Sequence, residues 1–341
     1  MKHPRAFISK LLLAITAVVS VTSTTTVQAQ TKPLRVGWVY AMANAPALIA
    51  EQKQFFAEEG LKVEIKSFTD GPVLEQALAS GELDVAYIGT PPVYQWFARG
   101  FDARILAKVN YGQAAVIASN SSGIKTIADL KGKKLASVAK GSGMDVLLRG
   151  FVLRQHGKID PDKDLTIQPM PPGNMNAALD RNVVDAAFLW EPFVSQALLR
   201  GNTHLVLDVN QLVPQYPWYV IAAPVKTLKE RSGDIVKLLR AHRKAIAFLQ
   251  DKQAEADQII AQSFKLDTVQ KPDGKTVSAE AIVHEARNRL GWSDKLENRD
   301  LQFIQNLMDY SLDLGFIPNP LKVDQIVDLS YWQKSRSAQD K

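Results

Sequence analysis

The sequence predicts an α/β protein built from two lobes. The chain has 341 residues, more than one ordinary domain, and its 46% apolar residues can fill two hydrophobic cores. Strand and helix patterns alternate from residue 34 to residue 109, and the alternation restarts at residue 114. Successive β-α units of this kind are typical of a largely parallel sheet covered by helices.

The first block contains the elements expected for one such sheet. The β-rich or apolar runs predict strands at residues 34–40, 61–68, 83–88 and 103–109, and helices are predicted at residues 45–59, 71–80 and 91–99. Leu48, Ile49, Phe55 and Phe56 are expected on the buried side of the first of these helices. Asp70-Gly71-Pro72 is a typical helix start, because proline suits the first helical turn.

The second block has the same texture, which indicates a second α/β lobe inserted into the first. Strands are predicted at residues 114–119, 135–138, 165–169, 186–189 and 218–223, and helices at residues 127–134, 145–156 and 174–181. Later helices are expected at residues 235–249, 254–263, 279–290 and 300–314, with a surface loop at 265–275. We therefore expect lobe I at residues 30–113 and 223–341, and lobe II at residues 114–222.

The first 29 residues have the pattern of an export signal. Lys2, Arg5 and Lys10 precede an apolar run at residues 11–21, and Val27-Gln28-Ala29 is a small-residue cleavage site. Removal of these three basic residues lowers the formal net charge from +6 to about +3. The basic excess is therefore weak support for nucleic-acid binding, and none is expected.

The chain contains no cysteine, which excludes disulfides, cysteine metal sites and a thiol nucleophile. It also excludes a lipid-modified N-terminal cysteine. We expect an exported protein that is not lipid-anchored and that resides in the periplasm if the host has an outer membrane.

Candidate binding loops follow the predicted strands, where ligands of open α/β sheets bind. They are Met42-Ala-Asn-Ala-Pro46, Thr69-Asp-Gly-Pro72, Gly89-Thr-Pro-Pro92, Lys140-Gly-Ser-Gly143, Pro171-Pro-Gly-Asn174 and Trp190-Glu-Pro192. The fourth loop is the best candidate for an anion, because its glycines allow close backbone approach and Ser142 adds a hydroxyl before a helix. It lacks the Gly-Lys-Ser/Thr ending of a nucleotide-binding loop.

Two residues of the last loop have alternative interpretations. Trp190 follows a buried strand, where its indole can cover an apolar part of a ligand or pack between helices. Glu191 can contact a ligand, or bond to the backbone or an arginine. The motifs of serine hydrolases, zinc proteases and nucleotide enzymes are not found, and the histidines are scattered, so no catalysis and no cofactor are expected.

Several sequence blocks of the two predicted lobes occur in a specific order and spacing. For the first lobe they are Gly71-Pro-Val-Leu-Glu-Gln-Ala-Leu-Ala-Ser-Gly81 and the stretch from Leu83 to Pro92. For the second lobe they are the stretch from Ile127 to Leu135, Lys140-Gly-Ser142, and the stretch from Val184 to Pro192. Together these blocks resemble the periplasmic solute-binding proteins for nitrate, taurine and aliphatic sulfonates. The resemblance covers nearly the whole chain after the signal, and Gly89-Thr-Pro-Pro-Val93 is most similar to the sulfonate group.

The resemblance implies a type II periplasmic binding protein, in which two doubly wound lobes joined by two crossing segments close on a small organic anion. The expected partner is an ABC permease of the inner membrane, and we expect a monomer. The implied ligand-binding residues are Asn44, Asp70, Gly71, Gly89, Thr90, Gly141, Ser142, Trp190 and Glu191. Hinges are expected near residues 111–116 and 216–222.

Three alternatives stay open at this level. The ligand could be taurine, nitrate, a sulfate ester or an aromatic acid, and a carboxylate facing it from Asp70 or Glu191 would favour a zwitterion. The protein could report to a sensory receptor instead of a permease. The third alternative is an enzyme of the thiamin-pyrimidine type on the same scaffold, but the cysteines that the resemblance would require are missing.

Overall fold

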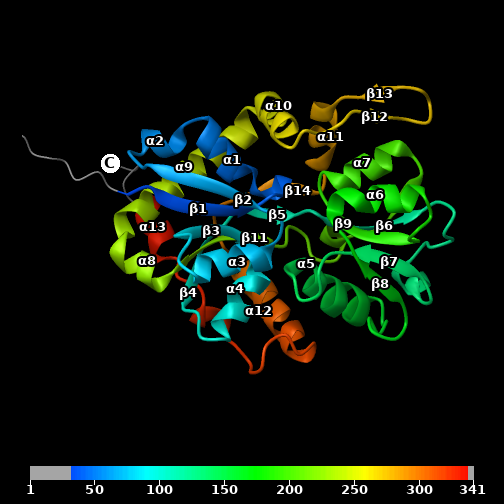
Figure 1. The fold of residues 1–341 in the computed structure, drawn as a ribbon, viewed down its shortest axis with the longest axis horizontal. Coiled ribbons are helices and arrows are strands. Elements are labelled where there is room, and N and C mark those ends of the chain that lie inside the picture. The colour runs from blue at the N-terminus through cyan, green and yellow to red at the C-terminus, as the bar shows by residue number, and fades with distance from the viewer. Residues whose placement is uncertain (1–31, 337–341) are drawn as a thin grey trace, which may run out of the picture. The chain divides into compact units, whose positions relative to one another are not determined.

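The computed structural model describes residues 32–336, and the predicted export signal lies outside this range (Figure 1). Most of the strands in this range belong to two five-stranded sheets. Within residues 32–336, no helix has both the length and the apolar character needed to cross a membrane.

The first sheet has the strand order β2-β1-β3-β11-β4. Its strands are β1 (Leu34–Val39), β2 (Val63–Phe68), β3 (Val85–Gly89), β4 (Ala103–Lys108) and β11 (Tyr219–Pro224). β1 is parallel to both β2 and β3, whereas β11 runs antiparallel between β3 and β4. The parallel β-α units predicted from the sequence are therefore present. The antiparallel strand β11 joins this sheet only after the chain has passed through the second sheet.

The second sheet has the strand order β10-β6-β9-β7-β8. Its strands are β6 (Ala114–Ser119), β7 (Lys134–Ser137), β8 (Thr166–Pro169), β9 (Ala186–Trp190) and β10 (Thr203–Asp208). β7 is parallel to β8 and β9, and β6 is antiparallel to β9 and β10. The edge strand β10 was not predicted, because its half-exposed residues give no continuous apolar run.

Two short ribbons complete the strands. β5 (Asn110–Gly112) pairs with β14 (Leu290–Trp292), and β12 (Val269–Gln270) pairs with β13 (Thr276–Val277). The second ribbon lies partly in the segment predicted as a surface loop. The helix predicted at residues 279–290 ends at Ala286, and Leu290 is already the first residue of β14.

Helices cover both faces of the first sheet, with α1 and α9 on one side and α3 and α4 on the other (Figure 1). The helices of the first half are α1 (Ala45–Gln52), α2 (Phe55–Glu58), α3 (Gly71–Ala79), α4 (Thr90–Phe97), α5 (Gly143–Val146), the π-helical η3 (Leu147–His156), α6 (Pro172–Asp180) and α7 (Phe193–Arg200). Those of the second half are α8 (Val225–Glu230), α9 (Ser232–Asp251), α10 (Gln253–Ser263), α11 (Ala279–Ala286), α12 (Asn298–Asp313) and α13 (Ser330–Arg336). Short 3-10 turns are η1 (Met42–Asn44), η2 (Ile127–Leu130), η4 (Val209–Gln211) and η5 (Val323–Gln325).

The two segments that connect the sheets are bonded to each other. The Ala114 amide donates to the Tyr216 hydroxyl at 2.8 Å, and the Tyr219 amide donates to the Asn110 side-chain oxygen at 2.8 Å. These contacts bring the two segments expected to act as hinges together. The predicted lobe limits stay a prediction, and the limit at residue 222 falls inside β11, whose partners are all strands of the first sheet.

Glu75 is an unusual residue in the interior of the protein, because it is a buried carboxylic acid. It lies on α3, is fully buried, and neither carboxyl oxygen has a hydrogen-bond partner among the described residues. Burial raises its pKa from 4.5 to about 8, so the folded protein holds it protonated at neutral pH. In the unfolded chain the same group is ionised above about pH 4.5. Its contribution to stability is therefore fully present below pH 4.5 and is lost as the pH rises through 8.

We expect Glu75→Gln to raise the free energy of unfolding by about 4 kcal/mol at pH 8 and by little at pH 4.5, because the neutral amide does not ionise. Buried His242, whose pKa is lowered by burial to about 4, acts in the opposite direction between pH 4 and 6.5. Urea unfolding of the Glu75→Gln variant and of wild type at several pH values gives the difference in their free energies of unfolding, from which the shared effect of His242 cancels. The exposed Glu230→Gln serves as the control, and an equal gain at all pH values would contradict the prediction.

Candidate functional site

A cavity of about 460 Å³ is lined by residues of both sheets' loops. On the first-sheet side the lining residues are Val39, Thr69, Asp70, Gly71, Gly89, Pro92, Trp218 and Tyr219. On the second-sheet side they are Val138, Ala139, Ser142, Gly143, Met144, Pro169, Met170, Pro171, Pro172 and Trp190.

The position of the cavity follows from strand direction. β1 and β3 end at Val39 and Gly89, while β8 and β9 end at Pro169 and Trp190. β11 is antiparallel and enters the same edge at Tyr219. Carboxyl ends of parallel strands gather at one edge of a sheet, so their loops meet there and leave room for a ligand.

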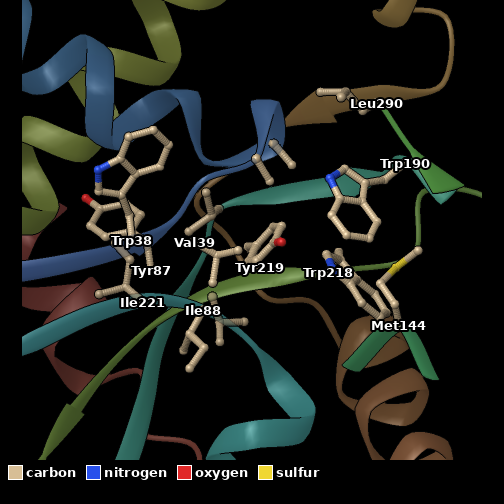
Figure 2. Packing of buried hydrophobic residues seen from close by; sticks show 14 of the residues in the cluster. Trp38, Val39, Tyr87, Ile88, Met144, Trp190, Trp218, Tyr219, Ile221 and Leu290 are labelled. Carbon is tan, nitrogen blue, oxygen red and sulfur yellow. The ribbon is translucent and has the colours of Figure 1, made fainter. Parts of the chain in front are cut away.

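The cavity wall is mainly apolar and aromatic. Figure 2 shows Trp190, Trp218, Met144 and Tyr219 around the same space, with the Tyr219 hydroxyl directed toward the two indoles. The rings of Trp218 and Tyr219 pack edge-on with their centroids 6.5 Å apart, and those of Trp190 and Phe193 do so at a centroid distance of 6.4 Å. Both indoles are thus held by neighbouring rings and present a fixed surface to an apolar part of a ligand.

The start of the helix at Gly143 supplies the best set of hydrogen-bond donors. Ser142 caps this helix by accepting the Asp145 amide at 3.3 Å, which leaves the hydroxyl hydrogen of Ser142 free to donate. Gly143 and Met144 both line the cavity, and N–H groups in the first turn have no acceptor inside the helix. α5 continues into η3, so the helix is long enough to carry a dipole.

Two other helix starts near the cavity offer fewer donors. α4 begins at Thr90 and continues with Pro91 and Pro92, which have no N–H. α3 begins with Gly71 and Pro72, and the next amide, that of Val73, already donates to Asp70 at 3.0 Å. The main-chain donors left there are the amides of Thr90 and Gly71.

The charge of the lining is acidic. Asp70 is the one carboxylate among the described residues that line the cavity, and no lysine, arginine or histidine is among them. An anion bound here would be stabilised by neutral N–H and O–H groups instead of a neutralising cation, an arrangement that keeps binding reversible.

The nine residues expected from the sequence fall into two groups. Asp70, Gly71, Gly89, Ser142 and Trp190 line the cavity, whereas Asn44, Thr90, Gly141 and Glu191 do not. Asn44 is fully buried, and its side-chain amide donates to the carbonyl oxygens of Val39 at 2.8 Å and of Tyr87 at 3.4 Å. It holds the loop after β1.

Thr90 and Gly141 are adjacent to lining residues but do not line the cavity themselves. The Thr90 side chain is fully buried. The Gly141 amide donates to the Asp145 carboxylate at 2.8 Å, and its carbonyl accepts from Gln95 at 3.0 Å. Its φ of +82° requires glycine. The main chain of Gly141 therefore shapes the loop that presents Ser142, and burial raises the pKa of Asp145 against the opposing effect of the Gly141 amide and Arg149.

Glu191 is fully buried in a polar cluster behind the cavity wall. Its carboxylate accepts from the Arg289 guanidinium and from the Ser195 amide, the latter at 3.1 Å. Arg289 also donates to the Ser195 hydroxyl at 2.9 Å. Burial raises the pKa of Glu191, while Arg289 opposes that rise. Of the interpretations given for Glu191 from the sequence, bonds to the backbone and to an arginine are the ones that its contacts match.

Several lining residues were not singled out from the sequence. Trp218 and Tyr219 were assigned to a strand, and only the antiparallel entry of β11 brings them to the carboxyl edge of the first sheet. Met144 and Met170 gave no signal beyond their place next to candidate loops. No group of three or more acidic, histidine or cysteine side chains suited to a metal ion occurs within residues 32–336.

Two α/β lobes with a cavity between the carboxyl ends of their strands define the class of periplasmic binding proteins. The periplasmic aliphatic sulphonate binding protein SsuA of Escherichia coli superposes with a TM-score of 0.73 at 23% identity, covering 87% of this chain and 92% of that one. The nitrate-binding protein NrtA of Synechocystis PCC 6803 gives 0.73 at 19% identity, covering 91% and 89%.

The family follows from sequence. Residues 27–264 match the NMT1-like family, and the chain belongs to that family. A protein of Escherichia coli K12, provisionally named as an aliphatic sulfonates-binding protein, is 30% identical over 263 residues, which cover 74% of this chain and 79% of that protein. A protein of Bacillus subtilis with the same provisional name is 26% identical over 312 residues, covering 90% and 89%. These matches confirm the resemblance found in the sequence.

Proposed function

We propose that this protein is the periplasmic binding component of an ABC importer and that it binds a small organic sulfonate in the cavity. The observation that carries the proposal is the donor set of Ser142, Gly143 and Met144 beside an apolar, aromatic wall. A sulfonate spreads one charge over three oxygens, which several neutral donors can satisfy. The names of the relatives point to the same ligand class.

The size and polarity of the cavity favour an organic anion over nitrate. A cavity of about 460 Å³ with two indoles and two methionines has far more apolar surface than a small inorganic anion can cover. An alkyl or aryl group attached to the sulfonate would fill that space.

An aminosulfonate is the second candidate, and Asp70 is the specific reason. Its carboxylate lines the cavity and is partly exposed, so it can pair with an ammonium group and would repel a simple anion. Glu191 gives no such support, because its carboxylate is already paired with Arg289.

We propose that the ligand closes the lobes by bridging them. Gly71 and Gly89 would contact it from the first sheet, and Ser142 and Trp190 from the second. The bond from Gln95 to Gly141 already joins the two sides at the cavity edge. Only the closed arrangement makes all contacts at once, so the ligand shifts the population toward it.

Intrinsic fluorescence tests the proposal, since two of the six tryptophans line the cavity. The chain without its first 29 residues is unfolded and refolded to remove bound ligand, then titrated with alkanesulfonates, arenesulfonates, taurine, nitrate, sulfate and carboxylates matched in structure to the sulfonates. Saturation by sulfonates and not by the matched carboxylates supports the proposal, and no response to any sulfonate overturns it. Recovery of the ligand unchanged from the complex separates binding from catalysis.

We expect Ser142→Ala to weaken sulfonate binding about tenfold, because one charge-assisted hydrogen bond is lost. Isothermal titration measures the change in Kd. Ser121→Ala, on an exposed serine outside the cavity, is the matched control and should leave Kd unchanged. Equal affinities for the two variants would show that the Ser142 hydroxyl does not contact the ligand.

A further inference from the structure

A second hollow of about 240 Å³ lies beside the cavity. Pro92 lines both spaces, and Gly141 of the hollow directly precedes Ser142 of the cavity. Trp96 and Phe316 form apolar parts of its wall. The hollow is therefore next to the proposed anion-binding end of the cavity.

Two cations face this hollow from opposite lobes. Arg99 follows α4 of the first lobe, is exposed, and has no ion pair or side-chain hydrogen bond with any of the described residues. Lys140 belongs to the loop before α5 in the second lobe and is also exposed. Its ammonium lies 3.6 Å from the Asp162 carboxylate.

Asp162 cannot neutralise Lys140 fully, because other cations share it. Its carboxylate lies 2.8 Å from Arg149 and 3.9 Å from Arg154. Asp145 takes a second bond from Arg149 at 2.7 Å. The network thus holds three cations and two carboxylates, and Arg99 adds a further positive charge across the hollow.

We propose that this hollow is an anion-capture site that attracts the ligand and passes it to the cavity, an inference that rests on the proposed function. The cavity itself cannot supply this attraction, since its one charged side chain is the Asp70 carboxylate. A positive entrance beside it raises the local concentration of anions and their rate of association.

The same geometry favours closure around an anion. The cationic groups of Arg99 and Lys140 approach one hollow from two lobes, so bringing the lobes together increases their mutual repulsion. An anion between them replaces that repulsion by two attractions. Because Arg99 and Lys140 flank the Gln95–Gly141 bond, the anion would act at the point where the lobes already touch.

The test compares Arg99→Gln/Lys140→Gln with wild type by stopped-flow tryptophan fluorescence, using an alkanesulfonate that saturates wild type. At low ionic strength the association rate constant should fall about tenfold, and its dependence on salt should weaken. Lys229→Gln/Lys271→Gln removes the same charge from an exposed and a half-buried position elsewhere and is the matched control. Equal association rates for the two double variants would overturn the inference.

A second measurement needs no sulfonate and separates this inference from the proposed function. Sodium sulfate, matched in ionic strength by sodium chloride, should raise the melting temperature of wild type and of Lys229→Gln/Lys271→Gln more than that of Arg99→Gln/Lys140→Gln. If sulfonates fail to bind but this difference is present, the proposed function falls and the anion site stands. An equal rise in all three proteins would show that the hollow holds no anion.

Discussion

Trp190→Ala is expected to weaken sulfonate binding about 100-fold. Trp190 is the last residue of β9, and its side chain is 6% exposed. Its indole and that of Trp218 form part of the apolar wall of the cavity (Figure 2). Removing a large buried aromatic group costs about 3 kcal/mol of contact and leaves a space that the ligand cannot fill. Isothermal titration against the tightest ligand of the fluorescence panel measures the loss.

Two companion variants separate the ligand contact from a general loss of packing. Trp190→Phe keeps an apolar ring at the same place and should lose about tenfold or less. Trp332→Phe, on α13 and outside the cavity, should bind like wild type although its indole bonds to Asp294 at 2.8 Å. A folded Trp190→Ala protein with a Kd within threefold of wild type would show that the ligand does not use this wall.

The sequence predicted the fold well because the relevant signals are local. Apolar strands such as β3 and β9, helix starts such as Asp70-Gly71-Pro72, and glycine-containing loops all depend on neighbouring residues. Strands of opposite direction are harder to foresee. β11 reads as an apolar run, and its antiparallel place between β3 and β4 depends on contacts with residues more than a hundred positions away.

Individual site residues were less predictable than the loops that contain them. Asn44 follows β1, where its short polar side chain is used by the nearest carbonyl groups. Trp190 is the last residue of β9, and its indole lines the cavity at the end of that strand. The role of Glu191 depends on Arg289, which is 98 positions away, and nothing in the local sequence reveals that partner.

Glu191→Ala is expected to lower the free energy of unfolding by about 4 kcal/mol while leaving the ligand contacts in place. The substitution removes the buried carboxylate that pairs with the Arg289 guanidinium, whose side chain is 10% exposed, and leaves that guanidinium only the more exposed Glu285 carboxylate at 3.6 Å. It also leaves the Ser195 amide without its acceptor. Breaking one side of a buried ion pair usually costs 3–5 kcal/mol, because the remaining charge is desolvated and unpaired. Urea unfolding monitored by circular dichroism measures the change.

The double variant Glu191→Ala/Arg289→Ala decides between a structural and a ligand-binding role. If the carboxylate serves the ion pair, the double variant should lose clearly less free energy of unfolding than the two single variants added together. The reason is that removal of both side chains leaves neither charge of the pair buried without its partner. The Kd for the sulfonate, measured where each protein is fully folded, should then stay within threefold of wild type. A stable Glu191→Ala protein that fails to bind sulfonate would instead place this carboxylate in the ligand site, as the resemblance to the binding-protein family implied.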